Sequence, residues 1–145
     1  MLITIFGESC TGKSTLAEVL KARTGAEMYS GKDYLRLAKS EGEARALFQK
    51  QLNEAAEGNA SLIYVIAEPE LLALVPDGGV RVLVTGELDE IKARFAARMG
   101  GTLPPPVAAM LERKHGCFDQ IPHDVHMVNG MDSLDDVCEK ILSLT

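Results

Sequence analysis

The sequence predicts one α/β domain covering residues 1–145, with a five-stranded parallel sheet between two layers of helices. Three observations predict it. Short apolar runs alternate with segments of helical periodicity from end to end, as in chains of repeated strand–helix units. Two of the runs, Leu62–Ala67 and Val80–Thr85, are apolar almost throughout, as expected of strands covered on both faces. A glycine-containing loop, Gly7–Ser14, joins the first strand to the first helix.

In the first half of the chain, strands are expected at Leu2–Phe6 and Glu27–Tyr29. The helix between them, Lys13–Arg23, places apolar residues at i, i+3 and i+4 and ends at a glycine. The segment Ser30–Arg36 is expected to be a turn leading into a helix. A further helix begins at Ser40, which has capping-box spacing with the glutamate three residues later, and it ends near Gly58.

In the second half, the strand Leu62–Ala67 ends at Glu68-Pro69, where a short helix is expected. After the strand Val80–Thr85, an apolar stripe beginning at Leu88 predicts a helix closed by Gly100-Gly101. The triple proline in Thr102–Pro106 predicts a stiff linker. The remaining expected elements are a helix over Val107–His115, a strand over Val125–Val128 and a final helix capped by Ser133 and Asp136.

The loop Gly7–Ser14 has the pattern G-x-x-x-x-G-K-[ST] between a strand and a helix. In this context backbone N–H groups point inward and the helix N-terminus adds partial positive charge, which together bind phosphate. Lys13 is expected to reach the β- and γ-phosphates of a nucleoside triphosphate, and the Ser14 hydroxyl to ligate Mg²⁺. The predicted nucleotide-binding residues are consecutive: Gly7, Glu8, Ser9, Cys10, Thr11, Gly12, Lys13, Ser14 and Thr15.

Composition narrows the function classes. The net charge is −6 with no basic block, so nucleic-acid binding is not expected. No apolar run approaches the ~20 residues that span a bilayer, and Met1 leads directly into a strand without a basic leader. The odd count of three cysteines does not suggest a disulfide framework. A cytoplasmic protein without membrane partners is therefore expected, and the sequence leaves its oligomeric state open.

Several charged residues lie where parallel strands end, or near the proline-rich linker. Arg94 and Arg98 share one helix face because they are four residues apart. Asp33 follows the second strand and Glu68 the third, so either carboxylate could hold Mg²⁺ through water or accept the acceptor's proton.

These stretches together resemble the small P-loop kinases of the nucleoside monophosphate kinase type, namely the cytidylate kinase-like and adenylate kinase-like proteins. The resemblance rests on the phosphate loop, on the Ser/Thr-Gly…Arg segment Ser30–Arg36, and on Arg94-x-x-x-Arg98 followed by a proline-rich hinge and Arg113. It implies the three-layer P-loop NTPase fold, an acceptor-side helical insert over about residues 33–58 and a lid over about residues 100–118.

The resemblance also implies roles for individual residues. Lys13, Asp33, Arg98 and Arg113 would be catalytic, with the two arginines closing over the transferring phosphate. Asp33, Arg36 and Glu68 would contact the acceptor. Asn129-Gly130-Met131 would line the nucleotide base. The third strand is followed by Glu68-Pro69 instead of the Asp-Gly-x-Pro-Arg of adenylate kinases, so the sequence does not name the acceptor.

Three hypotheses follow. The first is an ATP-dependent, Mg²⁺-using phosphotransferase whose acceptor is a nucleoside, a nucleotide or another small metabolite; the absence of an N-K-x-D run favours ATP over GTP. The second is a nucleotide-binding switch with little turnover. The third is a kinase of a non-nucleotide hydroxyl, with Asp33 as the base. The spacing of His115, Cys117, His123 and His126 is not that of paired zinc ligands. Cys10 is a candidate oxidation site because it lies beside a helix N-terminus.

Overall fold

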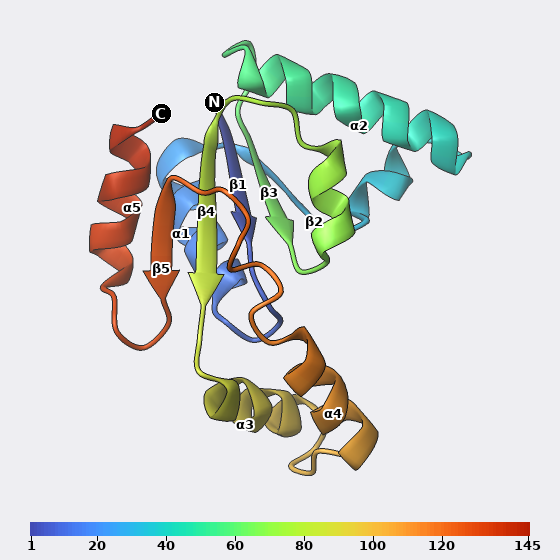
Figure 1. Ribbon diagram of the computed structural model, residues 1–145. Coiled ribbons are helices and arrows are strands. Elements are labelled where there is room, and N and C mark those ends of the chain that lie inside the picture. Colours follow the sequence, from blue (N-terminus) through green and yellow to red (C-terminus); the bar gives the residue numbers. More distant parts are fainter.

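The computed structural model describes all residues from 1 to 145. Five parallel strands form one sheet in the order β2-β3-β1-β4-β5 (Figure 1). The strands are β1 (Leu2–Phe6), β2 (Glu27–Ser30), β3 (Leu62–Ile66), β4 (Val80–Thr85) and β5 (Val125–Val128). Every residue of β1 and β3 is buried, as their apolar runs predict. The predicted fold class, with a parallel sheet between helical layers, is confirmed.

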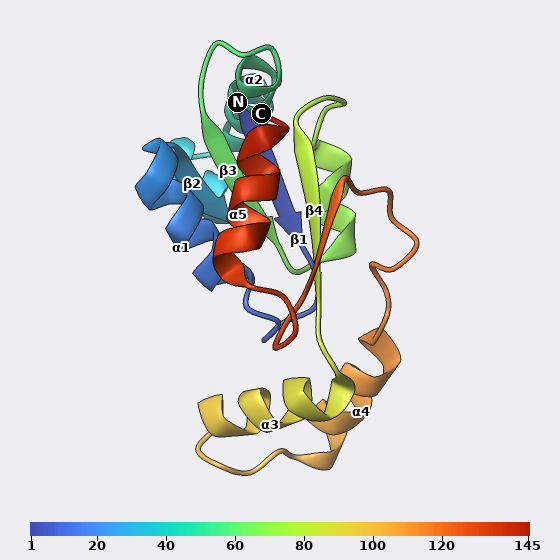
Figure 2. The same ribbon diagram turned by 90° about the vertical axis from the view of Figure 1, so that its left-hand side faces the viewer.

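Helices cover both faces of the sheet and divide the apolar interior into two cores (Figures 1 and 2). On one face, α1 (Lys13–Thr24) and α5 (Leu134–Ser143) bury residues such as Leu20 and Ile141. On the other, α2 (Glu41–Ala56) and the 3-10 helix η2 (Pro69–Leu74) contribute Phe48 and Leu71. Phe118 completes this second core against Phe6, with the ring centroids 5.7 Å apart. None of the helices combines the length and apolar character needed to cross a membrane.

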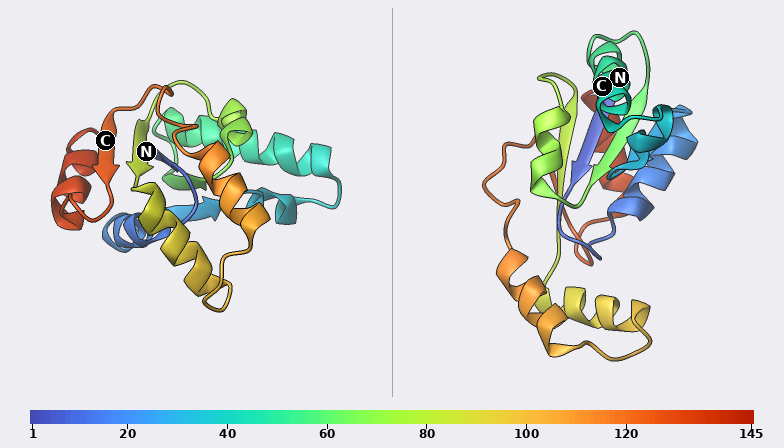
Figure 3. Two further views of the ribbon diagram at one scale, coloured as in Figure 1. Left: turned by 60° about the horizontal axis from the view of Figure 1, so that its bottom comes forward. Right: turned by 90° about the vertical axis from the view of Figure 1, so that its right-hand side faces the viewer.

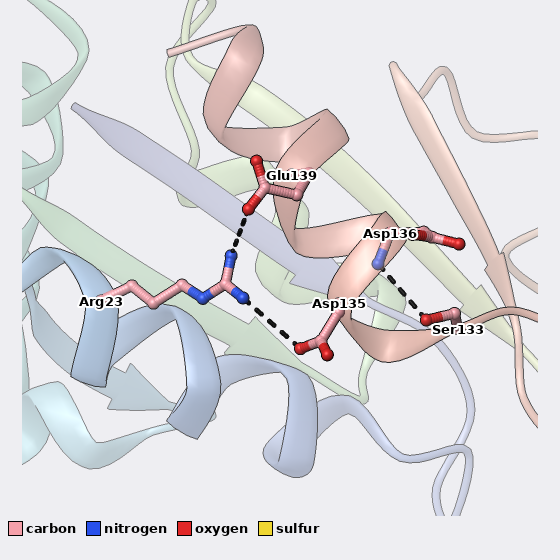
Figure 4. Close-up of polar contacts among 5 residues, drawn as sticks. All are labelled: Arg23, Ser133, Asp135, Asp136 and Glu139. Carbon is pink, nitrogen blue, oxygen red and sulfur yellow. Dashed lines mark hydrogen bonds and ion pairs between the residues drawn. The ribbon is translucent and has the colours of Figure 1, made fainter.

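The caps expected from the sequence form at α2 and α5. Ser40 accepts a hydrogen bond from the backbone N–H of Glu43, and Ser133 accepts one from that of Asp136. Arg23 near the end of α1 forms ion pairs with Asp135 and Glu139 on α5, which join the two helices on the surface (Figure 4). The segment after β2 forms a 3-10 helix, η1 (Asp33–Leu37).

Two helices, α3 (Leu88–Arg98) and α4 (Pro105–Lys114), form an arm that projects beyond the carboxyl ends of the strands (Figures 1 and 3). The predicted boundary between linker and helix is wrong by two residues, because α4 begins at Pro105. Pro104 is the N-cap, and prolines at the first helical positions give up only N–H groups that have no partner within a helix. Gly100 and Gly101, both with positive φ, form the bend between the two helices.

Candidate nucleotide and acceptor site

The loop between β1 and α1 is shaped by two of its glycines. A Cβ on Gly7 would lie 2.1 Å from the carbonyl oxygen of Val84, so any other residue would push β1 and β4 apart. Gly12 adopts φ 92° and is the N-cap of α1, and no side chain caps that helix end. The first N–H groups of α1 therefore have no side-chain acceptor, which is the arrangement that binds phosphate.

Lys13 lies at the start of α1, and only 7% of its surface is exposed. Its Nζ donates a hydrogen bond to the backbone carbonyl of Glu8 within the same loop. Burial, as the largest effect, and the nearby positive charge of Arg98 together lower the pKa of Lys13 to about 8, against opposing effects of Cys10 and Glu8. A bound anion would favour the charged ammonium, so the site is electrostatically suited to phosphate.

Cys10 holds the loop against the arm. It is the only non-glycine residue with positive φ, at 62°. Its carbonyl accepts a hydrogen bond from Arg94 Nη1 at 3.1 Å, and its buried side chain packs with Ile91 of α3 and Leu111 of α4. Because a left-handed non-glycine residue persists only where its surroundings hold it, Arg94 and these apolar contacts stabilise this conformation.

Glu8 forms a second connection between the loop and the arm. Its side chain is 10% exposed, with Oε1 3.1 Å from His115 Nδ1. Its Oε2 accepts a hydrogen bond from the backbone N–H of Gly116 at 3.2 Å. The sequence assigned Glu8 only as a member of the loop, because a position that accepts many residues carries no signal for a partner 107 residues away.

Two cavities open beside the loop. The first, of about 220 Å³, lies between the loop and the ends of β2 and β3. Its lining from outside the loop comprises Thr15, Ser30, Gly31, Val65, Ala67, Glu68, Leu71 and Arg98. The second, of about 360 Å³, lies between the loop, α3 and the segment after β5. Arg98 is the only residue of the arm that lines both cavities.

The second cavity is lined by Arg94 and Arg98 on one side and by Asn129 and Asp132 on the other. Asp132 Oδ2 accepts a hydrogen bond from the backbone N–H of Val128 at 2.7 Å, which folds the segment after β5 around the cavity. Of the predicted base-lining residues Asn129, Gly130 and Met131, only Asn129 lines this cavity. Met131 is 83% exposed.

Three of the residues predicted to be catalytic or to bind the acceptor lie outside both cavities. Asp33 is exposed, and its Oδ2 accepts a hydrogen bond from the backbone N–H of Ser30 at 3.0 Å. The guanidinium carbon of Arg36 lies 4.9 Å from the centre of the Tyr29 ring. Arg113 is exposed near the end of α4. Glu68, by contrast, lines the first cavity together with Lys13 and Ser14.

The donor atoms present suit Mg²⁺ held mainly by nucleotide phosphates. Ser14 and Glu68 line one cavity and supply oxygen atoms, the ligands Mg²⁺ prefers. The chain has no group of three or more His, Cys, Asp or Glu side chains able to hold a metal ion. A cation bound by one hydroxyl, one carboxylate through water and the substrate phosphates needs no such cage.

No protein-family model matches the chain, and no curated protein matches it by sequence. Solved structures do match it. The fold is that of the P-loop kinases. A shikimate kinase from Acinetobacter baumannii, solved with shikimate, is 15% identical, with a TM-score of 0.63 over 99% of this chain and 91% of its own. A sugar kinase from Janibacter sp. is 17% identical, with a TM-score of 0.62 over 99% and 92%.

A third match is the YorR protein from Bacillus subtilis, solved in complex with phosphorylated GDP. It is 20% identical, with a TM-score of 0.63 over 99% of this chain and 95% of its own. The named kinases act on small molecules of differing chemistry, so the likeness supports the P-loop kinase fold and not specifically its cytidylate or adenylate kinase branch.

Proposed function

We propose that this protein transfers the γ-phosphoryl group of ATP, bound with Mg²⁺, to a small-molecule acceptor. The observation that carries the proposal is that Lys13, Arg98 and residues of the loop line one cavity at the carboxyl end of the sheet. Phosphoryl transfer asks a protein mainly to position the reactants and to stabilise charge on the moving oxygens. A site with two cations beside a phosphate loop meets both needs.

Each side chain has a part in this proposal. The loop amides and Lys13 bind the β- and γ-phosphates, and Arg98 stabilises the charge on the transferring group from the side of the arm. Mg²⁺, when bound, neutralises phosphate charge and orients the γ-phosphoryl group. Glu68 faces the acceptor side, and the cavity between Arg94, Arg98 and Asn129 has room for the nucleotide base. Arg113 would need the arm to move before it could reach the phosphates.

Two classes of acceptor fit the proposal. The resemblance to nucleoside monophosphate kinases favours a nucleoside or a nucleotide. The second class is a hydroxyl metabolite that is not a nucleotide; the shikimate, sugar and gluconate kinases among the similar structures act on such compounds. The absence of the third-strand aspartate motif of adenylate kinases supports this second class.

Calorimetry with Mg²⁺-ATP and an assay of ADP formation together test the proposal. We expect saturable binding of Mg²⁺-ATP and ADP formation that depends on an added acceptor. Binding without acceptor-dependent turnover would favour the nucleotide switch instead. No heat with any nucleoside triphosphate would overturn both functions.

A further inference from the structure

The acceptor side of the first cavity offers no aromatic face. Tyr29, Tyr34, Phe48 and Tyr64 lie in the segments around it, but all four are at most 5% exposed. They pack on one another, with Phe48 4.9 Å from Tyr29, 5.2 Å from Tyr34 and 4.8 Å from Tyr64 between ring centroids. The aromatic surface that could stack on a nucleobase is therefore used to fix η1 and α2 against the sheet.

The Tyr64 hydroxyl fixes the turn that follows β2, which forms part of the cavity wall. It donates a hydrogen bond to the carbonyl of Gly31 at 2.7 Å, tying the end of β2 to β3. Burial, with the nearby Tyr34, Glu68 and Asp33, raises the pKa of Tyr64, so the hydroxyl stays protonated and keeps donating. Gly31 and Ser30, which form the cavity wall here, are thereby held in place.

The space that remains is small. The first cavity measures about 220 Å³ and includes the room beside the loop where the donor's terminal phosphates would lie. Pockets for drug-sized ligands usually measure at least about 300 Å³. The enclosed part of the cavity therefore favours a small acceptor.

The charges in the cavity limit the acceptor further. Lys13 and Arg98 are its only cationic side chains, and the proposed function assigns both to the phosphates of ATP. Arg36, the other candidate cation, lies outside the cavity over the Tyr29 ring. The one acidic side chain in the cavity is Glu68. A phosphate or carboxylate on the acceptor would thus face a carboxylate with no cation of its own.

Building on the proposed function, we infer that the acceptor is a small hydroxyl compound without phosphate or carboxylate: a polyol, a neutral sugar or an amino alcohol. The acceptor oxygen forms a bond to the γ-phosphorus, and the bond from that phosphorus to the β–γ bridging oxygen breaks, releasing ADP. The hydroxyl proton passes to the Glu68 carboxylate and from there to water. Glu68 also accepts hydrogen bonds from neighbouring hydroxyl or ammonium groups of the acceptor.

The test is a panel of acceptors with the full-length protein and Mg²⁺-ATP, read as ADP formation. One arm holds glucose, ribitol, glycerol and ethanolamine. A second holds adenosine, cytidine, AMP and CMP, and a third holds the carboxylates shikimate and gluconate. We expect ADP formation to rise at least tenfold over background with a member of the first arm only. Acceleration confined to either of the other arms overturns the inference.

Variants of two neighbouring glutamates sharpen the test. Glu68→Gln should lower kcat by about 10²-fold or more, as expected for loss of a general base; an effect confined to the Kd for Mg²⁺-ATP would instead assign Glu68 to holding Mg²⁺ through water. Glu70→Gln is the matched control, because Glu70 is exposed and lines neither cavity.

If Mg²⁺-ATP binds but no compound of the first arm accelerates ADP formation, the acceptor class is wrong. If Mg²⁺-ATP does not bind, the proposed function itself fails.

Discussion

The donor and acceptor sides of the cavity are built in opposite ways. On the proposed donor side, Lys13 is buried, and the backbone N–H groups at the start of α1 have no side-chain cap. On the proposed acceptor side, Asp33, Arg36 and Glu68 are exposed; only Glu68 lines the cavity, while Asp33 bonds to Ser30 and Arg36 lies over Tyr29, both within the preceding few residues. The geometry of a site made of backbone N–H groups is determined by the local sequence of one loop. The geometry of a site made of side chains depends also on residues that are distant in the sequence.

The largest effect should come from Lys13→Ala, which removes the buried cation of the donor side. The loss of one charge-stabilising donor typically lowers kcat about 10²- to 10³-fold. The measurement is ADP formation with the best acceptor, alongside the Kd for Mg²⁺-ATP. Lys21→Ala is the control, because Lys21 is an exposed residue of the same helix. Equal activity of the two variants would contradict the donor-side assignment.

Glu8→Ala tests whether the donor side depends on the arm. The change removes the acceptor of the Gly116 N–H and the partner of His115. Hydrogen bonds to a charged group contribute about 1.5–3 kcal/mol, so the free energy of unfolding in urea should fall by about that amount. Hydrogen exchange should become faster at Gly116 and in α4.

Glu18→Ala, an exposed substitution on α1, is the control for Glu8→Ala. Unchanged stability and unchanged exchange in the Glu8 variant would mean that the contacts between loop and arm do not hold the two together. In that case Cys10, with Arg94 and the apolar contacts around it, would be the main connection.

The difference between local and long-range contacts also explains which features the sequence predicted. All five strands, the phosphate loop and the caps Ser40 and Ser133 follow from local patterns, and the structure has each of them. The sequence did not predict the contacts of Glu8 with His115 and of Arg94 with Cys10, whose partners are 107 and 84 positions apart. It also did not predict that Arg98 lines both cavities, because their linings come from separate elements. No periodicity or spacing encodes such a pairing. The start of α4 was missed because a proline run also suits a linker.

The lowered pKa of Lys13 predicts a pH dependence that is specific to the donor side. The folded value is about 8 and the unfolded value 10.5, so between these values the unfolded chain binds more protons. Stability should therefore rise with pH in this window, by at most about 1.4 kcal/mol per pH unit for a single proton. Lys13→Met should remove this contribution, which is measured as the difference between the two unfolding curves from pH 7 to 10.5.

Nucleotide binding should reverse that shift. A triphosphate beside Lys13 favours the ammonium, so binding near pH 8 should take up a fraction of a proton. Calorimetry in two buffers with different ionisation enthalpies measures this uptake. If Lys13→Met took up as many protons as the wild type, the uptake would belong to another group.

The smallest effect is expected at Arg36, on the acceptor side. Its guanidinium lies over the Tyr29 ring, and a cation–π contact at an exposed site contributes about 0.5–1 kcal/mol. Arg36→Ala should lower the free energy of unfolding by about that amount, and the exposed neighbour Lys39 supplies the control Lys39→Ala. If Arg36→Ala instead raised the KM of the acceptor about tenfold and left stability unchanged, Arg36 would bind an anionic acceptor. The acceptor side would then carry a phosphate or carboxylate site of its own, and its difference from the donor side would be one of exposure alone.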